Sequence, residues 1–263
     1  MSLTKTEIKY LVSLQNKKGR RNEKRFLCEG VRLLEEALDS GYFPKTVFYS
    51  PADISDRGKK LIEDFTKKKV RVQTVSIKEI NRLSDTKAPQ GIVALFEMRN
   101  YSLEKQLHTN HRNILVCDNI GDPGNLGTLL RSAVAFDISL IITTDGSAEL
   151  ANPKTIRASM GAFFKLPFIE NVNDELLVDE LKANSYKIYN ADVKGKYISE
   201  TTPKSEQSAL VIGSEAIGTG KALTESADYR IKIPISKKAE SLNAAMAGTV
   251  LMFWMNLRER AKK

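Results

Sequence analysis

Apolar residues in the first hundred positions alternate between strand-like and helix-like spacing. Four short runs are apolar or alternate with polar residues, and they predict strands at 26–29, 45–49, 70–75 and 92–96. Spacings of three and four between apolar residues predict helices at 31–38 and 58–68, and a short helix capped by Ser76 that ends at Leu83. Strands that alternate with helices predict a mostly parallel or mixed sheet covered by helices.

Residues 98–112 are polar and lack a clear period, so we interpret residues 101–111 as a linker between domains at 1–100 and 112–263. In the second domain, the pattern of apolar residues predicts strands at 114–117, 139–143, 187–190, 209–212 and 230–233. Its helices are predicted at 125–136, 153–160, 174–184 and 242–258, the last one amphipathic. The whole chain is therefore predicted to be an α/β protein with two domains.

Positive charge is concentrated near the start of the chain. The 263 residues carry 41 Lys and Arg against 32 Asp and Glu, a formal net charge of +9. Residues 1–25 hold eight Lys or Arg but only Glu7 and Glu23 as acids. This concentration favours a polyanion partner, through neutralisation of phosphates and release of counterions. A solvated basic face that aids solubility is the alternative.

Several classes of protein are disfavoured by composition. Two cysteines, Cys28 and Cys117, exclude a disulfide scaffold and fit a reducing cytosol, so we expect a cytoplasmic protein. Two cysteines and two histidines also leave little material for a zinc site, and we expect no metal. The apolar runs are far shorter than the ~18 residues of a membrane span, so we expect no membrane partner.

Three segments of the second domain could carry chemistry. The first, DNIGDPGNLGTLLRSA at 118–133, follows a strand and opens a helix that holds Asn125 and Arg131. Its glycines are spaced G-x-x-G-x-x-G, which differs from the G-x-G-x-x-G of dinucleotide-binding proteins and disfavours a nicotinamide dehydrogenase. A capped surface helix with a solvated arginine is the simpler alternative.

The second segment, LVIGSEAIGTG at 210–220, runs from an apolar strand into Gly213 and Gly218, with Glu215 between them. It fails as a phosphate-binding P-loop because Thr219 stands where lysine is required. Glycines after a strand let the backbone approach a ligand closely, although a plain exit from a strand would look the same.

The third segment, IPISKKAESLNAAMAGTVLMF at 233–253, ends a strand and starts the last helix. Ser241 or Asn243 is predicted to cap that helix. Its small residues, Ala244, Ala245, Ala247 and Gly248, indicate close packing against a neighbour. For Ser241 alone, a capping role is the simpler interpretation.

Together, NxGxxxR, GxExxG and IP…SLN resemble the three motifs of the SpoU (TrmH-like) family of RNA ribose 2′-O-methyltransferases, within the SPOUT superfamily. The segment between them, TDGSAELANPKTIRASMGAFFKLP, is similar to the family's connecting stretch, so the resemblance covers about 112–257. FLCEGVRLLEEAL and APQGIVALF, at 26–38 and 88–96, resemble the family's ribosomal-protein-like substrate-binding domain. One departure is that SKKAE and AAMAG stand where the family often has glycine and a second serine.

The resemblance implies a C-terminal trefoil knot that binds S-adenosylmethionine, a rare kind of topology. Its knotted loops would surround 213–220 and 233–242, and members are usually homodimers that pair through this region. By position, the cofactor would contact Gly213, Gly218, Ile233, Leu242 and, as a weaker candidate, Thr143. The resemblance also implies a catalytic group of Arg131, Asn125, Glu215, Ser241 and Asn243.

The implied reaction is transfer of a methyl group to a ribose 2′-hydroxyl of a structured RNA. Arg131 takes the position of the family's proposed catalytic arginine, where it acts either as a base or as an anchor for the adjacent phosphate. A guanidinium group has a pKa above ~12, which favours the anchor. Ribosomal RNA of the large subunit is our first choice of substrate. A transfer RNA substrate and a non-catalytic RNA-binding paralogue are the alternatives.

Overall fold

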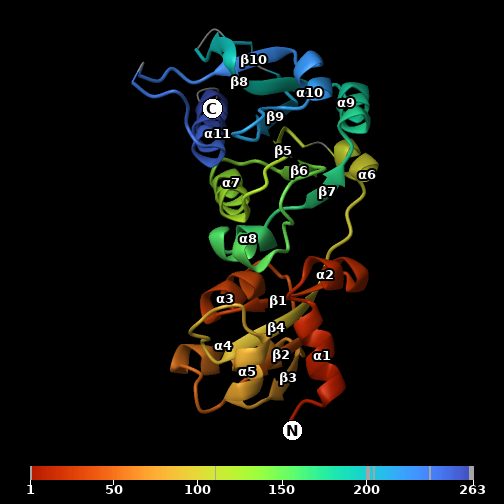
Figure 1. Cartoon of the computed structure of the whole chain (residues 1–263), viewed down its shortest axis with the longest axis vertical. Coiled ribbons are helices and arrows are strands. Elements are labelled where there is room, and N and C mark those ends of the chain that lie inside the picture. Colours follow the sequence, from red (N-terminus) through yellow and green to blue (C-terminus); the bar gives the residue numbers. More distant parts are fainter. Residues whose placement is uncertain (1, 110, 200–201, 204, 237, 261–263) are drawn as a thin grey trace. The chain divides into compact units, whose positions relative to one another are not determined.

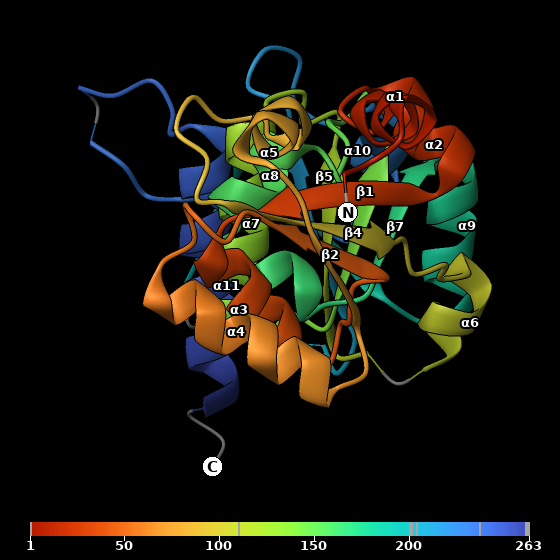
Figure 2. The same ribbon diagram turned by 90° about the horizontal axis from the view of Figure 1, so that it is seen from below.

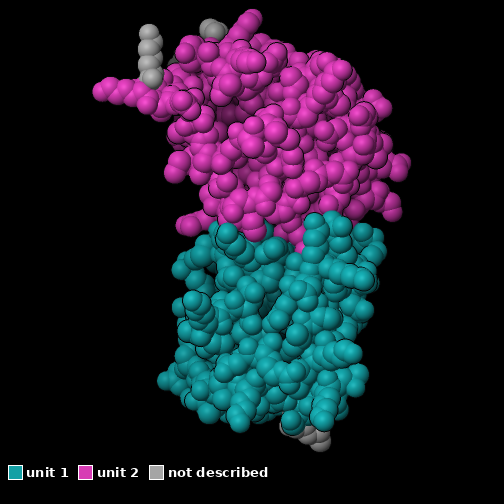
Figure 3. Space-filling view, viewed as in Figure 1, with its two compact units in different colours: residues 1–100, 151–164 teal, residues 101–150, 165–263 magenta. Residues whose placement is uncertain are grey.

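A computed structural model of the chain describes residues 2–260 apart from 110, 200–201, 204 and 237. The chain divides into two compact units (Figure 3). Unit 1 contains residues 1–100 and 151–164, and unit 2 contains residues 101–150 and 165–263. The second segment of unit 1 is therefore inserted in the sequence between two parts of unit 2, whereas the sequence pattern had placed it in the domain at 112–263.

Unit 1 is built on a four-stranded mixed sheet with the strand order β1-β4-β2-β3. The strands are β1 (Arg25–Glu29), β2 (Thr46–Tyr49), β3 (Arg71–Thr74) and β4 (Ile92–Glu97). Only β2 and β3 pair in parallel, while β4 is antiparallel to both of its neighbours. The four strands and the mixed sheet predicted from the sequence are confirmed.

Helices cover both faces of the unit 1 sheet (Figure 2). The helices are α1 (Lys5–Ser13), α2 (Lys17–Glu23), α3 (Val31–Asp39), α4 (Asp56–Lys67) and α5 (Ile77–Leu83). Leu27, Phe48 and Val93 share a buried core with apolar residues of α1 and α5, while α3 and α4 lie on the opposite face. Helix α5 begins with a capping box of Ser76 and Glu79, which confirms the predicted cap.

An aromatic cluster explains why residues 151–164 belong to unit 1. This segment forms α8 (Pro153–Ala158) and a short 3₁₀ helix, η1 (Ala162–Phe164). Phe163 contacts Phe26 edge to face at a centroid distance of 5.2 Å, and Phe164 contacts Phe96 at 5.4 Å. Edge-to-face and offset pairs of this kind stabilise beyond the area they bury. The segment is therefore fastened to β1 and β4 by side chains.

Unit 2 is built on a six-stranded sheet with the order β10-β8-β9-β5-β6-β7, in which every pair is parallel (Figure 1). The strands are β5 (Asn113–Asp118), β6 (Leu140–Thr144), β7 (Phe168–Val172), β8 (Lys187–Tyr197), β9 (Ser208–Gly213) and β10 (Tyr229–Lys232). The five predicted strands and the parallel sheet are confirmed. Strand β7 was not predicted, and β8 extends seven residues beyond Asn190.

Helices also cover both faces of the unit 2 sheet (Figure 1). Leu107, Leu177 and Leu223 share one buried core, so α6 (Leu103–His108), α9 (Asp174–Ala183) and α10 (Lys221–Glu225) lie on one face. Helices α7 (Pro123–Ala135) and α11 (Ala244–Arg260) lie together on the other face. Helix α6 occupies the range interpreted as a linker, and its Leu107 is only 2% exposed.

The order of the strands locates the best place for a site in unit 2. From β5 the chain continues through α7 to β6 and then β7 on one side, whereas β9, β8 and β10 extend the sheet on the other. Parallel α/β sheets bind ligands outside the carboxyl ends of the strands where this direction changes. That point lies at the ends of β5 and β9, next to Asp118 and Gly213.

Candidate active site

A cavity of about 640 Å³ lies in unit 2 beyond the carboxyl end of β9. Its walls include four of the five residues expected to contact the cofactor, Gly213, Gly218, Ile233 and Leu242. They also include Glu215 and Ser241 from the expected catalytic group. The structure therefore brings the second and third motif segments together around one space, and its size is ordinary for a site that binds a small organic molecule.

The loop after β9 forms a tight turn at the edge of this cavity. The backbone N–H of Ser214 donates to the Gly218 carbonyl oxygen at 3.1 Å, and the Gly218 N–H donates to the Ser214 oxygen at 2.8 Å. A Cβ atom at Gly213 would lie 2.4 Å from the carbonyl carbon of Gly218, which no backbone can accept. Glycine at 213 is therefore required for the turn to fold back on β9.

Glu215 connects the first motif segment with the third. One oxygen of its carboxylate, Oε1, accepts a hydrogen bond from Asn125 Nδ2 at 3.0 Å and another from the Ala244 N–H at 2.9 Å. Asn125 is on the first turn of α7, and Ala244 begins α11. A carboxylate at two helix N-termini is favoured by both helix dipoles. Glu215 thus fixes the loop after β9 to both helices.

Two side chains cap these helices. Asp122 Oδ1 accepts from the Asn125 N–H at 2.8 Å at the start of α7. Asn243 Oδ1 accepts from the Met246 N–H at 2.7 Å, so the predicted cap of the last helix is Asn243 rather than Ser241. Helix α11 packs closely against α7, as the small residues predicted. At Gly248, an added Cβ atom would lie only 2.4 Å from Leu129 Cδ2 on α7.

Arg131 and Thr143 lie away from the walls of the cavity. Arg131 is exposed on α7, three residues after the exposed Thr128 and six after Asn125, so the three follow one row along the helix. Within the described part of the chain, Arg131 makes no hydrogen bond or ion pair. The side chain of Thr143 is only 1% exposed, and its Oγ1 accepts from the Asn171 N–H at 3.4 Å.

The carboxylate of Asp118, at the end of β5, fixes the other side of the loop after β9, and Asp174 at the start of α9 lies next to it. Buried Asp118 accepts from the Gly220 N–H through Oδ2 at 2.6 Å and from the Thr144 hydroxyl through Oδ1 at 2.5 Å. A Cβ atom at Gly220 would lie 2.4 Å from Asp174 Oδ2. Burial, together with the charges of Asp118, Glu175 and Asp145, raises the pKa of Asp174 to about 6.

This raised pKa predicts a dependence of stability on pH. The folded state holds the Asp174 proton up to about pH 6 and the unfolded state releases it near pH 4, so the free energy of unfolding falls as the pH rises between these values. Asp174→Asn removes this loss. The quantity to compare is the free energy of unfolding of Asp174→Asn minus that of wild type. We expect this difference to be ~1 kcal/mol larger at about pH 7.5 than at about pH 4.5, after allowing for solvent screening.

Urea denaturation at the two pH values measures this difference. Asp179→Asn changes an exposed carboxylate on the same helix and serves as the matched control. An Asp174→Asn protein whose stability relative to wild type is the same at both pH values contradicts the prediction.

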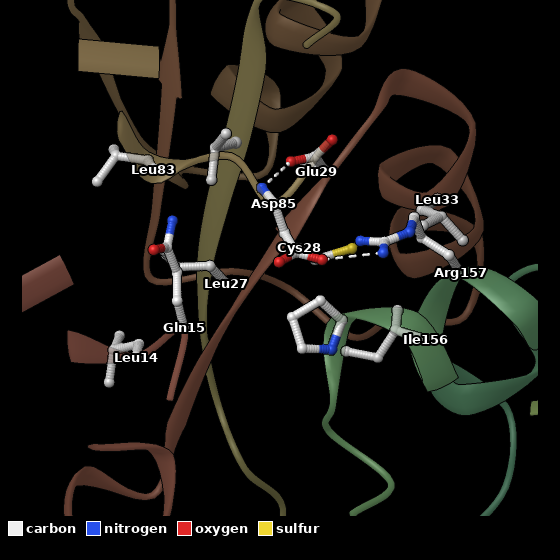
Figure 4. A pocket seen from close by; sticks show the side chains of 12 residues that line it. Leu14, Gln15, Leu27, Cys28, Glu29, Leu33, Leu83, Asp85, Ile156 and Arg157 are labelled. Atoms are coloured by element: carbon white, nitrogen blue, oxygen red, sulfur yellow. Dashed lines mark hydrogen bonds and ion pairs between the residues drawn. The ribbon is translucent and has the colours of Figure 1, made fainter. Parts of the chain in front are cut away.

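A second cavity, in unit 1, is too small for a cofactor. It measures about 20 Å³, which holds roughly one water molecule, and its walls include Cys28, Ile156 and Arg157 (Figure 4). Arg157 Nη2 donates to Asp85 Oδ2 at 2.9 Å beside it. Burial raises the pKa of the Cys28 thiol, so the cysteine is not a reactive group there.

Other kinds of site find little support in the described residues. No group of three His, Cys, Asp or Glu side chains is placed to hold a metal ion in the part of the chain that the structure describes. None of the helices described is both long and apolar enough to cross a membrane.

The motifs did not indicate every residue at the cavity. Asn190, at the bend of β8, lines it and is only 1% exposed. Its Oδ1 accepts from the Thr219 hydroxyl at 2.8 Å, which fastens the loop after β9 to β8. The sequence signal was the end of an apolar strand followed by polar residues, as in NADVK, which is common to many strand exits.

A parallel α/β unit with a glycine-lined cavity at the carboxyl ends of its strands is the arrangement of an enzyme that binds a small organic cofactor. Comparison with known proteins makes this class specific. The sequence model described as "SpoU rRNA Methylase family" matches residues 112–253, and the "MRM3-like substrate binding domain" matches residues 5–94. The chain belongs to the SpoU rRNA methylase family.

Relatives with known names agree with this family. The 23S rRNA (guanosine(2553)-2′-O)-methyltransferase RlmP of Bacillus subtilis is 33% identical over 94% of each chain. The mitochondrial rRNA methyltransferase 3 of Mus musculus is 31% identical over 89% of this chain and 68% of its own length. The AdoMet-bound rRNA methyltransferase of Sinorhizobium meliloti has a TM-score of 0.84 at 28% identity, covering 98% of this chain and 96% of its own.

Proposed function

We propose that the protein transfers the methyl group of S-adenosylmethionine to a ribose 2′-hydroxyl of large-subunit ribosomal RNA. The observation that carries this proposal is the cavity at which the loop after β9 and the segment before α11 meet, joined to α7 by Glu215. RlmP and the S. meliloti enzyme, whose names describe rRNA methylation and an AdoMet-bound state, support it.

The residues around the cavity fit the cofactor. Gly213 and Gly218 contribute backbone to its wall, and Ile233 and Leu242 add apolar surface. We propose that these four residues contact S-adenosylmethionine, which supplies an electrophilic methyl group when bound. Thr143 is not included, because its buried side chain lies outside the cavity wall.

We propose that the protein contributes alignment to the reaction rather than a strong base. Arg131, exposed on the rigid helix α7, would hold the phosphate next to the target ribose with its planar fork of donors. Glu215 keeps Asn125 and the start of α11 in place, and Asn243 and Ser241 provide polar groups near the hydroxyl. As the ribose oxygen bonds to the methyl carbon and the methyl–sulfur bond of the cofactor breaks, the hydroxyl proton, polarised by these groups, would pass to solvent water.

Unit 1 supports an RNA substrate. Its basic start, residues 1–25, carries a net charge of +6 by sequence, and the match to a substrate-binding domain spans residues 5–94. We propose that this unit binds structured RNA by shape and unpaired loops. We also propose that the protein is cytoplasmic, because a reducing compartment keeps free cysteines such as the two buried here from forming disulfides. A trefoil knot formed by the loops at 213–220 and 233–242 also belongs to this proposal.

We propose further that the protein forms a homodimer through α11. Four apolar side chains on this helix are exposed by 36–58% at spacings of four, three and four, which places them on one face: Met246, Val250, Phe253 and Leu257. Together with α7, the helix lies beside the candidate site. A second copy of the same face would cover this apolar row, as expected for an isologous dimer.

Met246→Glu tests the dimer. A charge placed in the apolar face and buried without a partner is expected to weaken association about tenfold or more. Sedimentation velocity of both proteins at micromolar concentration measures this effect. Leu176→Glu, at a residue 52% exposed on α9, is the control and should sediment like wild type. A monomeric wild-type protein, or a variant that dimerises as tightly, refutes the proposed interface.

The methyl transfer itself is tested with S-adenosylmethionine labelled in the methyl group. Unmodified transcripts of large-subunit rRNA, small-subunit rRNA and tRNA are incubated separately with the full-length protein, with Arg131→Ala as the control enzyme. Label in large-subunit rRNA, at a single alkali-resistant linkage, is the expected result. Label in tRNA alone would show that tRNA, and not ribosomal RNA, is the substrate. Failure to bind the cofactor, with RNA still bound, would favour a non-catalytic RNA-binding protein.

A further inference from the structure

Strand β8 carries an arch where it pairs with β10. Asn190 is paired with Arg230, and the next paired residue of β8 is Lys196, which faces Ile231. Residues 191–195 therefore have no partner on β10, and we call them the β8 arch. An insertion of this size bends the strand and redirects the side chains that follow it, a role that bulges often have next to active sites.

The β8 arch is held in place by its own contacts. The Asp192 carboxylate accepts from Arg230 Nε at 2.9 Å and from the Lys194 N–H at 2.7 Å. A Cβ atom at Gly195 would lie 2.6 Å from the Arg230 carbonyl carbon, so the arch touches the β10 backbone directly. These contacts fix the positions of the residues on the outer surface of the arch.

Two apolar side chains and several cations face outward from this region. Val193 is 68% exposed and Tyr197 is 60% exposed. Lys232 Nζ lies 4.2 Å from the centroid of the Tyr197 ring, a cation–π contact that covers one face of the ring. Because the tyrosine remains 60% exposed despite this contact, part of its ring surface is accessible to a planar group.

This surface is continuous with the candidate active site. Val193, Lys194, Tyr197 and Lys232 line the same cavity as Gly213 and Ile233. The charges beside the ring are positive, since Lys194 and Lys196 are exposed while Asp192 is paired with Arg230. Glu215 and Glu240 are the carboxylates on the remaining wall.

We propose that Tyr197, Lys194 and Lys232 form a platform for an unpaired nucleotide of the RNA substrate, next to the ribose that is methylated. The base stacks on Tyr197, and the two lysines contact the flanking phosphates. An exposed aromatic ring among cations is the combination with which proteins hold single-stranded nucleic acid. An apolar protein partner would not need the lysines.

The place of the platform has a physical advantage. The attacking hydroxyl must be held within a few tenths of an ångström of its productive position, and a contact on the same rigid unit as the cofactor cavity can do this. The basic residues of unit 1, which we propose also bind RNA, lie far from the β8 arch in the sequence and belong to the other unit. This inference rests on the proposed function and adds a substrate contact to it.

The test measures RNA binding and cofactor binding separately on the full-length protein. The RNA probe is an unmodified transcript of large-subunit rRNA, titrated by filter binding, and the cofactor probe is S-adenosylmethionine, titrated by calorimetry. The loss of one stacked base in Tyr197→Ala is expected to weaken RNA binding about 5- to 100-fold and to lower kcat/KM by at least the same factor. Tyr197→Phe keeps the ring and should bind RNA within about twofold of wild type.

The lysines are tested by salt dependence. Lys194→Ala is expected to lower the slope of log affinity against log salt by about 0.7, as for one lost phosphate contact on a single strand. Lys105→Ala on α6 and Leu176→Ala on α9 remove an exposed cation and an exposed apolar side chain elsewhere on unit 2, and both should bind RNA like wild type. All variants should keep wild-type affinity for S-adenosylmethionine.

The outcomes separate this inference from the proposed function. If wild type methylates rRNA and Tyr197→Ala binds RNA as tightly as wild type, the platform is refuted and the function stands. A Tyr197→Ala protein that loses cofactor affinity as strongly as RNA affinity also refutes it. If no RNA is methylated but Tyr197→Ala still weakens RNA binding, the proposed function falls, and the platform stands as an RNA contact without a methylated ribose beside it. A wild-type protein without affinity for RNA overturns both.

Discussion

Arg131→Ala is expected to lower the rate of methyl transfer about 100-fold or more while S-adenosylmethionine binding stays unchanged. The guanidinium is exposed on α7 and lies outside the cofactor cavity, so its removal leaves the cavity intact. Misplacement of a reacting group by about 1 Å can cost this much in rate. Arg131→Lys keeps the positive charge but loses the planar fork, and we expect an intermediate rate.

Single-turnover methylation of large-subunit rRNA, with RNA and enzyme above their dissociation constants, measures the effect on the chemical step. Lys105→Ala, at an exposed cation on the opposite face of the unit 2 sheet, is the matched control. Wild-type rates for Arg131→Ala would remove Arg131 from the proposed catalytic group. A lower rate that tracks lost cofactor affinity would show instead that α7 had been disturbed.

Gly213→Ala is expected to weaken S-adenosylmethionine binding about 10- to 100-fold. The added methyl group would lie 2.4 Å from the Gly218 carbonyl carbon and 2.5 Å from Thr219 N, so the turn after β9 must move. Overpacking of this kind costs about 1–3 kcal/mol, and here the displaced backbone is the wall of the cavity itself. Methyl transfer at low cofactor concentration should fall in proportion.

Calorimetric titration with S-adenosylmethionine measures this loss, and a thermal melt separates it from unfolding. Gly121→Ala is the control, because a Cβ atom there meets nothing within 4 Å among the described residues. A Gly213→Ala protein that melts near the wild-type temperature and binds the cofactor normally would show that the turn after β9 is not the cofactor wall.

The pattern of apolar residues predicted most of the strands but missed β7 and the two helices near the start of the chain. The first 25 residues attract attention for their charge, and helices α1 and α2 among them were not predicted. A capping box of Thr4 and Glu7, followed by Ile8 and Leu11, was the available signal for α1. In α2, KKGRRNE, the sequence contains no apolar residue from which a period could be read.

Other differences arise from contacts that a single sequence does not reveal. Helix α6 is six residues long, and only burial of Leu107 in the core of unit 2 distinguishes it from a polar loop. Phe163 and Phe164 join unit 1 because Phe26, Tyr42 and Phe96 surround them, and these partners lie far upstream in the chain. The spacing of apolar residues along the chain does not show which distant side chains will pack together.

The sequence predicted which segments contribute to the candidate site, but not the hydrogen bonds that connect these segments. The three motif segments were identified by resemblance; the second and third line one cavity, and the first is joined to them through Glu215. That Glu215 bonds both Asn125 and the start of α11 depends on the fold, because these partners are 90 and 29 residues away. Asn190 and the β8 arch were missed, since a bulge leaves no periodic signal in the sequence.

The insertion of residues 151–164 into unit 1 has a consequence for protein engineering. The backbone passes between the two units three times, after residues 100, 150 and 164, so no single cut separates them. A fragment that starts at residue 101 would keep Phe163 and Phe164, each 1% exposed in the whole chain, but would lose the rings that shield them. Such a fragment should aggregate. A transplantable catalytic module would need a short polar bridge from 150 to 165, and chimeras with other RNA-binding domains must carry the segment over with unit 1.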